Sequence, residues 1–217
     1  MSNRFNLSLS RPPSTTSIRL PCRLRPHWKR LLPVAIVAVL VAAAVTAWNT
    51  GDWRLNLSPS EPMGIWEVAP ITPGTRLRAG EIVTLCPRLP SGYHYGWLED
   101  KNHAMDACAD GRAPFLKTIV AGPGDVVHET GHGVIIDGHQ LPDSRPLPFT
   151  TSKPQVRLPQ WRGTVTLKAG RYWAYGAGDP RFSFDSRYWG PFRRARVRGV
   201  ARPVAVWKYA WTPGIKD

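Results

Sequence analysis

Three polar segments of the sequence contain residue types that can do nucleophilic and acid–base chemistry. The first covers residues 56–66 and places Ser58 and Ser60 on either side of a proline, with Pro62 and Gly64 just beyond. Proline fixes the backbone angle φ, and glycine permits close backbone approach. A serine presented on such a stiff turn can act as a nucleophile. Turns rich in serine and proline are also common as purely structural features, so this segment alone is a weak signal.

The second segment contains a lysine between apolar neighbours. If residues 114–120 form a strand, Phe115, Lys117 and Ile119 share one face of it. Burial disfavours an ammonium and lowers the pKa of a lysine. A neutral lysine amine can then take the proton of a serine hydroxyl. The alternative is that Lys117 lies on an edge strand and extends its amine into solvent. The pattern alone favours this alternative, because lysines are rarely fully buried.

The third segment, residues 176–192, gathers polar residues between aromatic ones. Its polar members are Asp179, Arg181, Ser183, Asp185, Ser186 and Arg187. Such a cluster can support a site from behind, and it can equally be a solvated loop. His128 and His132 fall in an expected hairpin and are expected on the surface, not as metal ligands. A serine–histidine–aspartate triad stays open by spacing, although no histidine lies near these segments in sequence. No metal or cofactor is expected.

The elements that must position these residues are predicted to be short strands. From about residue 51 the sequence alternates short β-type runs with glycine and proline. The expected strands are 64–68, 81–85, 114–120, 133–137, 164–167, 172–175 and 199–207. The pair Asp137-Gly138 after an apolar run predicts a hairpin. Residues 87–112 are expected to form a long loop. We therefore expect a mostly β domain, a folded-over sheet or barrel.

The N-terminal part has the pattern of a membrane anchor. Residues 1–30 contain arginine and lysine but no acidic residue, and residues 31–48 contain no charge. A helix over 31–48 is about 27 Å long, close to a hydrocarbon core of about 30 Å. Basic residues stay cytoplasmic, so residues 51–217 are expected outside. A cleaved signal peptide and a buried core helix are the alternatives.

The charge and the cysteines narrow the class further. A formal net charge of +14 suggests nucleic acid as a partner. We expect no nucleic-acid binding, because the densest basic charge directly precedes the apolar run and acidic residues are interspersed after it. Cys22 falls in the basic tail. Cys86 and Cys108 fall in the exported part, where thiols oxidise, so they either pair or remain free buried thiols.

The order of the three segments resembles the Ser/Lys-dyad signal peptidases, and within them the conjugative-transfer (TraF) type. The first motif, serine-x-proline-x-glycine-x-aromatic, matches residues 60–66. The second, an apolar residue, leucine and lysine followed by proline-glycine-aspartate, matches residues 115–125. The third, serine-x-aspartate-serine-arginine-tyrosine-x-glycine, matches residues 183–190. The resemblance covers nearly all of residues 50–205.

The resemblance implies a role for each matched residue. Ser60 is the expected nucleophile and Lys117 its general base, with the Ser60 backbone N–H and the Ser58 hydroxyl stabilising the oxyanion. Ser183 is expected to orient the Lys117 amine. Asp185 is expected to hold the surrounding turn with the help of Arg187. The pair Cys86 and Cys108, placed before the strand of Lys117, also resembles the cysteine pattern of the conjugative-transfer branch. Glu61 and Pro180 depart from the wider family's usual methionine and asparagine.

The resemblance also implies where the protein acts and on what. We expect a bacterial inner-membrane protein with one span, a cytoplasmic N-terminus and a periplasmic peptidase domain at residues 51–217. Its expected partner is a precursor such as a conjugative pilin, together with conjugation or secretion components. A general type I signal peptidase is the alternative enzyme, and a bitopic scaffold of a secretion apparatus is the non-enzymatic alternative. The sequence does not distinguish a linear product from a cyclic one.

Overall fold

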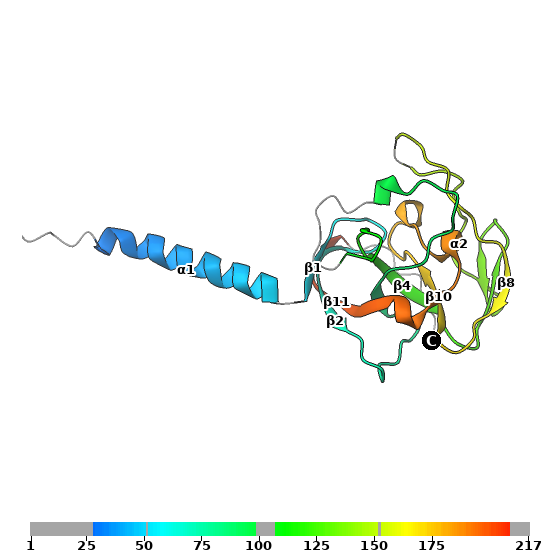
Figure 1. Ribbon diagram of the computed structural model, residues 1–217, viewed down its shortest axis with the longest axis horizontal. Coiled ribbons are helices and arrows are strands. Elements are labelled where there is room, and N and C mark those ends of the chain that lie inside the picture. Colours follow the sequence, from blue (N-terminus) through cyan, green and yellow to red (C-terminus); the bar gives the residue numbers. More distant parts are fainter. Residues whose placement is uncertain (1–27, 51, 99–106, 152, 209–217) are drawn as a thin grey trace, which may run out of the picture. The chain divides into compact units, whose positions relative to one another are not determined.

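The part of the chain that carries the three motifs folds into two antiparallel β-sheets in the computed structural model (Figure 1). The structure describes residues 28–50, 52–98, 107–151 and 153–208. The basic tail, including Cys22, lies outside these residues except for its last three positions. The elements are α1 (Trp28–Thr50), β1 (Trp53–Asn56), β2 (Met63–Pro70), β3 (Ile82–Leu85), η1 (Gly96–Leu98), β4 (Phe115–Ala121), β5 (Val126–Glu129), β6 (Val134–Ile136), β7 (His139–Gln140), β8 (Gly163–Thr166), β9 (Arg171–Tyr175), η2 (Pro180–Phe182), α2 (Ser186–Trp189), β10 (Phe192–Arg193), η3 (Arg194–Arg196) and β11 (Val197–Lys208).

The larger sheet has seven strands in the order β1-β2-β11-β3-β4-β9-β10. The long strand β11 crosses the middle of this sheet and pairs with both β2 and β3. Strand β4, which carries Lys117, lies between β3 and β9. At Lys117 itself β4 pairs with β3 alone within the described part of the chain, but the lysine is buried, so the solvent-directed amine that the local pattern favoured is wrong.

The smaller sheet has four strands in the order β7-β6-β5-β8. The hairpin expected at Asp137-Gly138 joins β6 to β7, with φ of 47° and 82° at its two central residues. Positive φ at both positions suits a two-residue turn whose twist matches the strands. The hairpin prediction is thus confirmed, and so is the mostly β fold class.

The main core lies where the larger sheet meets the third motif. Val83, Leu85 and Ile119 from the sheet are fully buried in one cluster with Tyr188 and Phe184. The rings of Phe184 and Tyr188 stack with centroids 5.1 Å apart. These contacts press residues 184–189 onto the sheet, and so hold the third motif beside β4 and β9.

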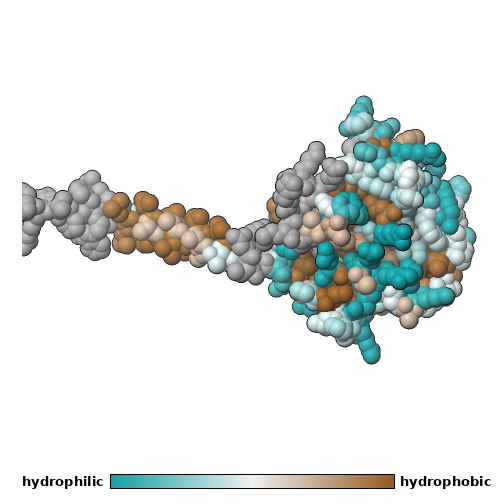
Figure 2. Space-filling model, viewed as in Figure 1, coloured by the Kyte–Doolittle hydropathy of each residue, from teal (hydrophilic) through white to brown (hydrophobic). Residues whose placement is uncertain are grey.

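Residues 28–45 of α1 belong to one compact unit, and the end of the helix belongs with the sheets to the second unit, residues 46–217. The described side chains of the helix, residues 31–46, are exposed and mostly hydrophobic (Figure 2). Among the described residues, none of the helices has both the length and the hydropathy required for a membrane span. The anchor predicted at residues 31–48 is therefore not confirmed.

Candidate active site

The Ser60 turn, residues Leu57–Pro62 between β1 and β2, is held in shape by the side chain of Asn56. Its Nδ2 donates to the carbonyl oxygens of Ser58, Glu61 and Pro62 at 3.0–3.1 Å. Its Oδ1 accepts the Ser58 N–H at 3.0 Å. One amide therefore ties together both ends of the turn. Nothing in the local pattern singled out Asn56, which lies at the very start of the motif.

The glycine of the first motif is required by a contact between two strands. Gly64 has φ of 150°, and a Cβ at this position would lie 2.2 Å from the Ala205 carbonyl oxygen of β11. Only glycine lets β2 approach β11 this closely just after the Ser60 turn. The spacing of Ser60 and Gly64 therefore reflects how the turn is joined to the sheet.

Lys117 reaches the Ser60 turn from β4. Its Nζ lies 2.9 Å from Ser60 Oγ and 2.8 Å from the Leu116 carbonyl oxygen. Both Ser60 and Lys117 are buried, at 3% and 5% exposure. Burial lowers the pKa of Lys117, while the carboxylates of Glu61 and Asp185 raise it. A neutral amine at this distance can accept the hydroxyl proton, because the contact then runs from Ser60 to Lys117.

Ser58 lies on the open side of the turn. Its Oγ is 3.0 Å from Ser60 Oγ and 3.4 Å from the Ser60 backbone N. An oxyanion that forms beside Ser60 Oγ therefore has a hydroxyl and an N–H on the same side. The arrangement resembles the donor pairs that stabilise tetrahedral intermediates of acyl transfer.

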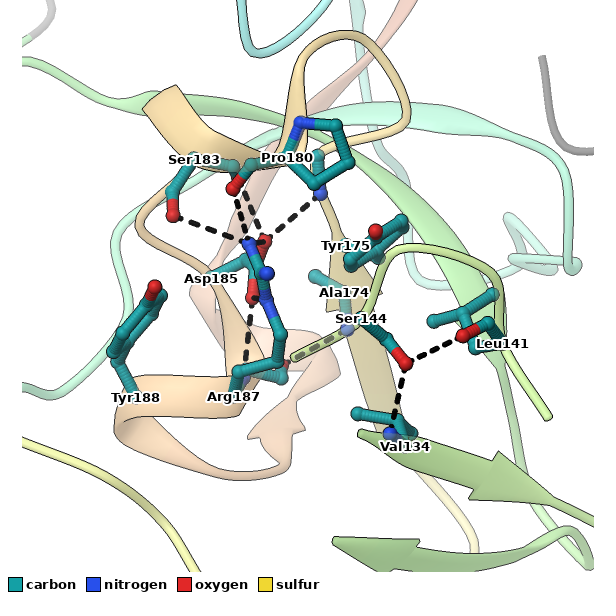
Figure 3. A network of polar contacts seen from close by, with 12 residues as sticks. Val134, Leu141, Ser144, Ala174, Tyr175, Pro180, Ser183, Asp185, Arg187 and Tyr188 are labelled. Carbon is teal, nitrogen blue, oxygen red and sulfur yellow. Dashed lines mark hydrogen bonds and ion pairs between the residues drawn. The ribbon is translucent and has the colours of Figure 1, made fainter. Parts of the chain in front are cut away.

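The third motif forms a buried ion pair behind the turn (Figure 3). Asp185 Oδ1 accepts Arg187 Nε at 2.8 Å, and Asp185 Oδ2 accepts Arg187 Nη2 at 2.8 Å. Oδ2 also accepts the Gly176 N–H at 3.0 Å. The Arg187 guanidinium lies over the ring of Tyr175, 4.9 Å from its centroid. Two-point pairing of this kind fixes the geometry of residues 176–187.

Ser183 contacts the ion pair and not the lysine. Its hydroxyl donates to Asp185 Oδ2 at 2.7 Å, and among the described residues it forms no hydrogen bond with Lys117. A Cβ on Gly176 would lie 2.0 Å from Ser183 Oγ and 3.0 Å from the Ser60 carbonyl oxygen. Ser183 thus lies close to the Ser60 turn. Its direct orientation of the Lys117 amine stays a prediction.

Two residues before η2 fasten the Ser60 turn from the other side. The Gly178 N–H donates to the Ser60 carbonyl oxygen at 2.9 Å, and the Asp179 N–H donates to the Pro59 carbonyl oxygen at 2.7 Å. A Cβ on Gly178 would lie 2.4 Å from the Pro59 oxygen. The glycine at 178 is therefore required by this close approach.

Glu61, which stands where the wider family usually has methionine, is buried within the Ser60 turn. It is 1% exposed, and its Oε1 accepts the Thr118 N–H at 2.8 Å and the Thr118 hydroxyl at 3.0 Å. The Ala177 N–H completes the set at 3.4 Å. Burial raises the pKa of Glu61 to about 7, against the lowering effect of Lys117 and these hydrogen bonds. An acidic residue in a proline-rich turn gives no local sign of burial.

A cleft of about 440 Å³ opens beside Ser60 and Lys117. One wall comes from Arg54–Ser58 and the other from Ala113–Lys117, with Trp66 and Thr84 also lining it. Strand β9 pairs with β4 only from Thr118 onward. Within the described part of the chain, residues 115–117 therefore have a strand neighbour on one side only, and their other side is unpaired.

A disulfide joins the two cysteines of the sheet domain. Cys86 and Cys108 are bonded, with their Cα atoms 5.7 Å apart, so of the two alternatives that the sequence left open the paired one holds. Among the described residues, no three His, Cys, Asp or Glu side chains form a group that could hold a metal ion. His128 Nδ1 lies 2.6 Å from Thr164 Oγ1 in the smaller sheet.

Comparison with known proteins identifies relatives over most of the chain. The family described as "Signal peptidase, peptidase S26" matches residues 25–207. The chain is 35% identical over 179 residues to the "Conjugal transfer protein TraF" of Agrobacterium tumefaciens, which covers 82% of this chain and 96% of that protein. It is 30% identical over 187 residues to the "Probable conjugal transfer protein TraF" of Sinorhizobium fredii, with 86% and 95% covered. A signal peptidase I structure from Enterococcus faecalis covers 58% of this chain and 97% of that chain at 18% identity and a TM-score of 0.32.

Proposed function

The chain belongs to the signal peptidase family S26, and from this membership we propose that it is a serine endopeptidase with Ser60 as nucleophile and Lys117 as general base. The observation that carries the proposal is the 2.9 Å contact between Ser60 Oγ and Lys117 Nζ, both buried. The non-enzymatic scaffold predicts no such contact, and the contact therefore argues against it.

The proposed reaction follows from the positions of these groups. Neutral Lys117 takes the proton of Ser60 as Oγ attacks the scissile carbonyl carbon. The Ser60 N–H and the Ser58 hydroxyl donate to the oxyanion, and a single donor of this kind is typically worth about 3–4 kcal/mol in the transition state. The Lys117 ammonium then gives its proton to the leaving amine. Water, deprotonated by the same lysine, releases the acyl group from Ser60.

The substrate is proposed to bind in the cleft as an extended segment. Residues 115–117 offer a strand edge that no described strand occupies, and Leu55–Ser58 line the same cleft. Addition of a strand to such an edge supplies main-chain hydrogen bonds to any sequence, while side-chain pockets give specificity. A cleft that ends at Ser60 and Lys117 places the scissile bond of such a segment at the dyad.

The class of substrate is proposed from the relatives, which are named as conjugal transfer proteins. We take it to be an exported precursor such as a conjugative pilin. Residues 31–48 are proposed as the anchor that keeps residues 51–217 beside a membrane-inserted precursor in the periplasm, with residues 1–30 in the cytoplasm. Fractionation of cells that express the full chain, and a chain lacking residues 1–48, tests this placement: an equal membrane fraction for both chains rejects the anchor.

The dyad is tested by replacing each of its members. Full-length Ser60→Ala and Lys117→Ala are expected to abolish cleavage of a co-expressed precursor, measured by the mass of the product, while the midpoint of unfolding stays close to that of the wild type. Ser91→Ala and Lys168→Ala, which replace exposed residues outside the cleft, are the matched controls. A fully active Lys117→Ala variant would remove the lysine from the mechanism. Parallel assays with a pilin precursor and a general preprotein separate the conjugative branch from a general signal peptidase, and the mass also distinguishes linear from cyclic products.

A further inference from the structure

Glu61 is a buried carboxyl group that the proposed reaction does not use. It directly follows Ser60, and it contacts the same strand, β4, that Ser60 contacts. Ser60 contacts Lys117, and Glu61 contacts the next residue of β4, Thr118. Two successive residues of the turn are thus joined to two successive residues of the strand. The carboxyl group therefore fixes the distance between the serine and the lysine.

The hydrogen bonds of Glu61 are unequally divided between its two oxygens. All three donors, the Thr118 N–H, the Thr118 hydroxyl and the Ala177 N–H, reach Oε1. Oε2 is buried and has no hydrogen-bond partner among the described residues. Burial of a carboxylate oxygen without a partner is costly. The burial of Oε2 lowers the stability of the fold, so stability does not account for a glutamate at this position. What remains to account for it is its charge.

The charges around the lysine show which carboxylate is available to it. The charges of Glu61 and Asp185 raise the pKa of Lys117, and the charge of Arg187 lowers it. Asp185 is already paired with Arg187 through two contacts of 2.8 Å. Glu61 forms no ion pair within the described part of the chain, and Lys117 is the cation that acts on it. When Lys117 takes the proton of Ser60, the new ammonium is buried, and of the two carboxylates that act on it Glu61 is the one without an arginine partner in the described part of the chain.

We propose that Glu61 is a positioning residue of the dyad, whose buried carboxyl group holds Ser60 against Lys117 and balances the charge of the Lys117 ammonium. This inference rests on the proposed function, since it acts through the lysine. The two groups titrate as a coupled pair, in which an ionised Glu61 favours the protonated lysine. Removing the carboxylate therefore makes the lysine easier to deprotonate and the ammonium intermediate harder to form.

Glu61→Gln in the full-length chain is the direct test. Its Oε1 can accept the same three hydrogen bonds, so the variant removes the charge and keeps the anchor. We expect a lower maximal rate of precursor cleavage, and a shift of the acid limb of the pH–rate profile to lower pH. Glu129→Gln is the matched control: Glu129 is equally buried, its Oε2 also has no hydrogen-bond partner among the described residues, and it lies in the smaller sheet. A positioning role that was only structural would lower the rate without moving the limb.

A second measurement separates this inference from the proposed function. NMR titration of ¹³C-labelled lysine, with the Lys117 signal assigned from Lys117→Arg, reports the protonation of the amine without any substrate. The Lys117 pKa is expected to be lower in Glu61→Gln than in the wild type and unchanged in Glu129→Gln. An unchanged pKa in both variants overturns the inference even if the dyad is correct. Full activity of Lys117→Ala overturns the dyad and leaves the measured coupling as it is.

Thr118→Val provides the test if Glu61→Gln does not fold. It removes one donor to Glu61 Oε1 with little change of shape, and so raises the pKa of Glu61. Glu61 is then ionised to a smaller extent at a given pH, and the acid limb moves to lower pH as before. Thr118→Ser, which keeps the hydroxyl, is expected to restore the wild-type profile. A Thr118→Val profile identical to that of Thr118→Ser contradicts the proposal.

Discussion

Asp185→Ala is expected to be among the most destabilising single substitutions in the sheet domain. Asp185 is fully buried and accepts hydrogen bonds from Arg187, Gly176 and Ser183. Its removal leaves the Arg187 guanidinium, 1% exposed, without its carboxylate. Breaking a buried pair by removing one partner costs about 3–5 kcal/mol. Since domains are stable by about 5–15 kcal/mol in total, the variant is expected to lose about a fifth or more of its stability.

Urea unfolding of the full-length chain, followed by tryptophan fluorescence, measures this loss as a lower midpoint at an unchanged slope. Arg181→Ala is the control, because the pair between Arg181 and Asp179 has its guanidinium 74% exposed and solvent screening makes such surface pairs contribute little to stability. The double variant Asp185→Ala/Arg187→Met removes both charges and is expected to recover part of the loss. If Asp185→Ala costs no more than Arg181→Ala, the buried ion pair does not hold the third motif as argued.

Three further predictions concern the disulfide, the Ser60 turn and pH. Replacing Cys86 and Cys108 together by serine opens a loop of 22 residues and is expected to cost about 3 kcal/mol in urea unfolding; an unchanged midpoint would contradict this. Gly178→Ala puts a Cβ 2.4 Å from the Pro59 carbonyl oxygen of the Ser60 turn and should lower the cleavage rate. Gly74→Ala, with open space around the new Cβ, should not lower it. Equal cleavage rates of the two variants would show that the close approach at Gly178 does not matter. Because the pKa of Glu61 is raised from 4.5 to about 7, its contribution to stability is fully present below pH 4.5 and is lost as pH rises through about 7. Unfolding curves between these pH values should therefore depend less on pH in Glu61→Gln than in the wild type.

The chemistry-bearing residues could be found from the sequence because they lie in short, ordered motifs. Ser60, Lys117 and Asp185 each stand in a segment with its own signature of proline, glycine or aromatic residues. The strands β2, β4 and β11 were also predictable, since their apolar runs are bounded by turn residues. The strands β1, β5 and β10, of two to four residues each, were not predicted, because so short a run shows little side-chain alternation.

The contacts between motifs could not be predicted, because they depend on which strands become neighbours. Lys117 has the local pattern of a solvent-directed lysine, and its burial arises only when β4 pairs with β3 and the lysine meets the Ser60 turn. Asn56 and Glu61 look like ordinary turn residues, and their hydrogen bonds to the turn and to Thr118 exist only once β1, β2 and β4 are assembled.

By itself the sequence determined the residue types available for chemistry, their order along the chain, and the mostly β class with its Asp137-Gly138 hairpin. Each of these depends on local rules of turn chemistry and side-chain alternation. Only the tertiary structure decided that Lys117 is buried against Ser60 and that Ser183 turns to Asp185. The physical reason is that burial and partner choice are set by pairings between residues far apart in the chain, such as 60 with 117, and no local pattern encodes them.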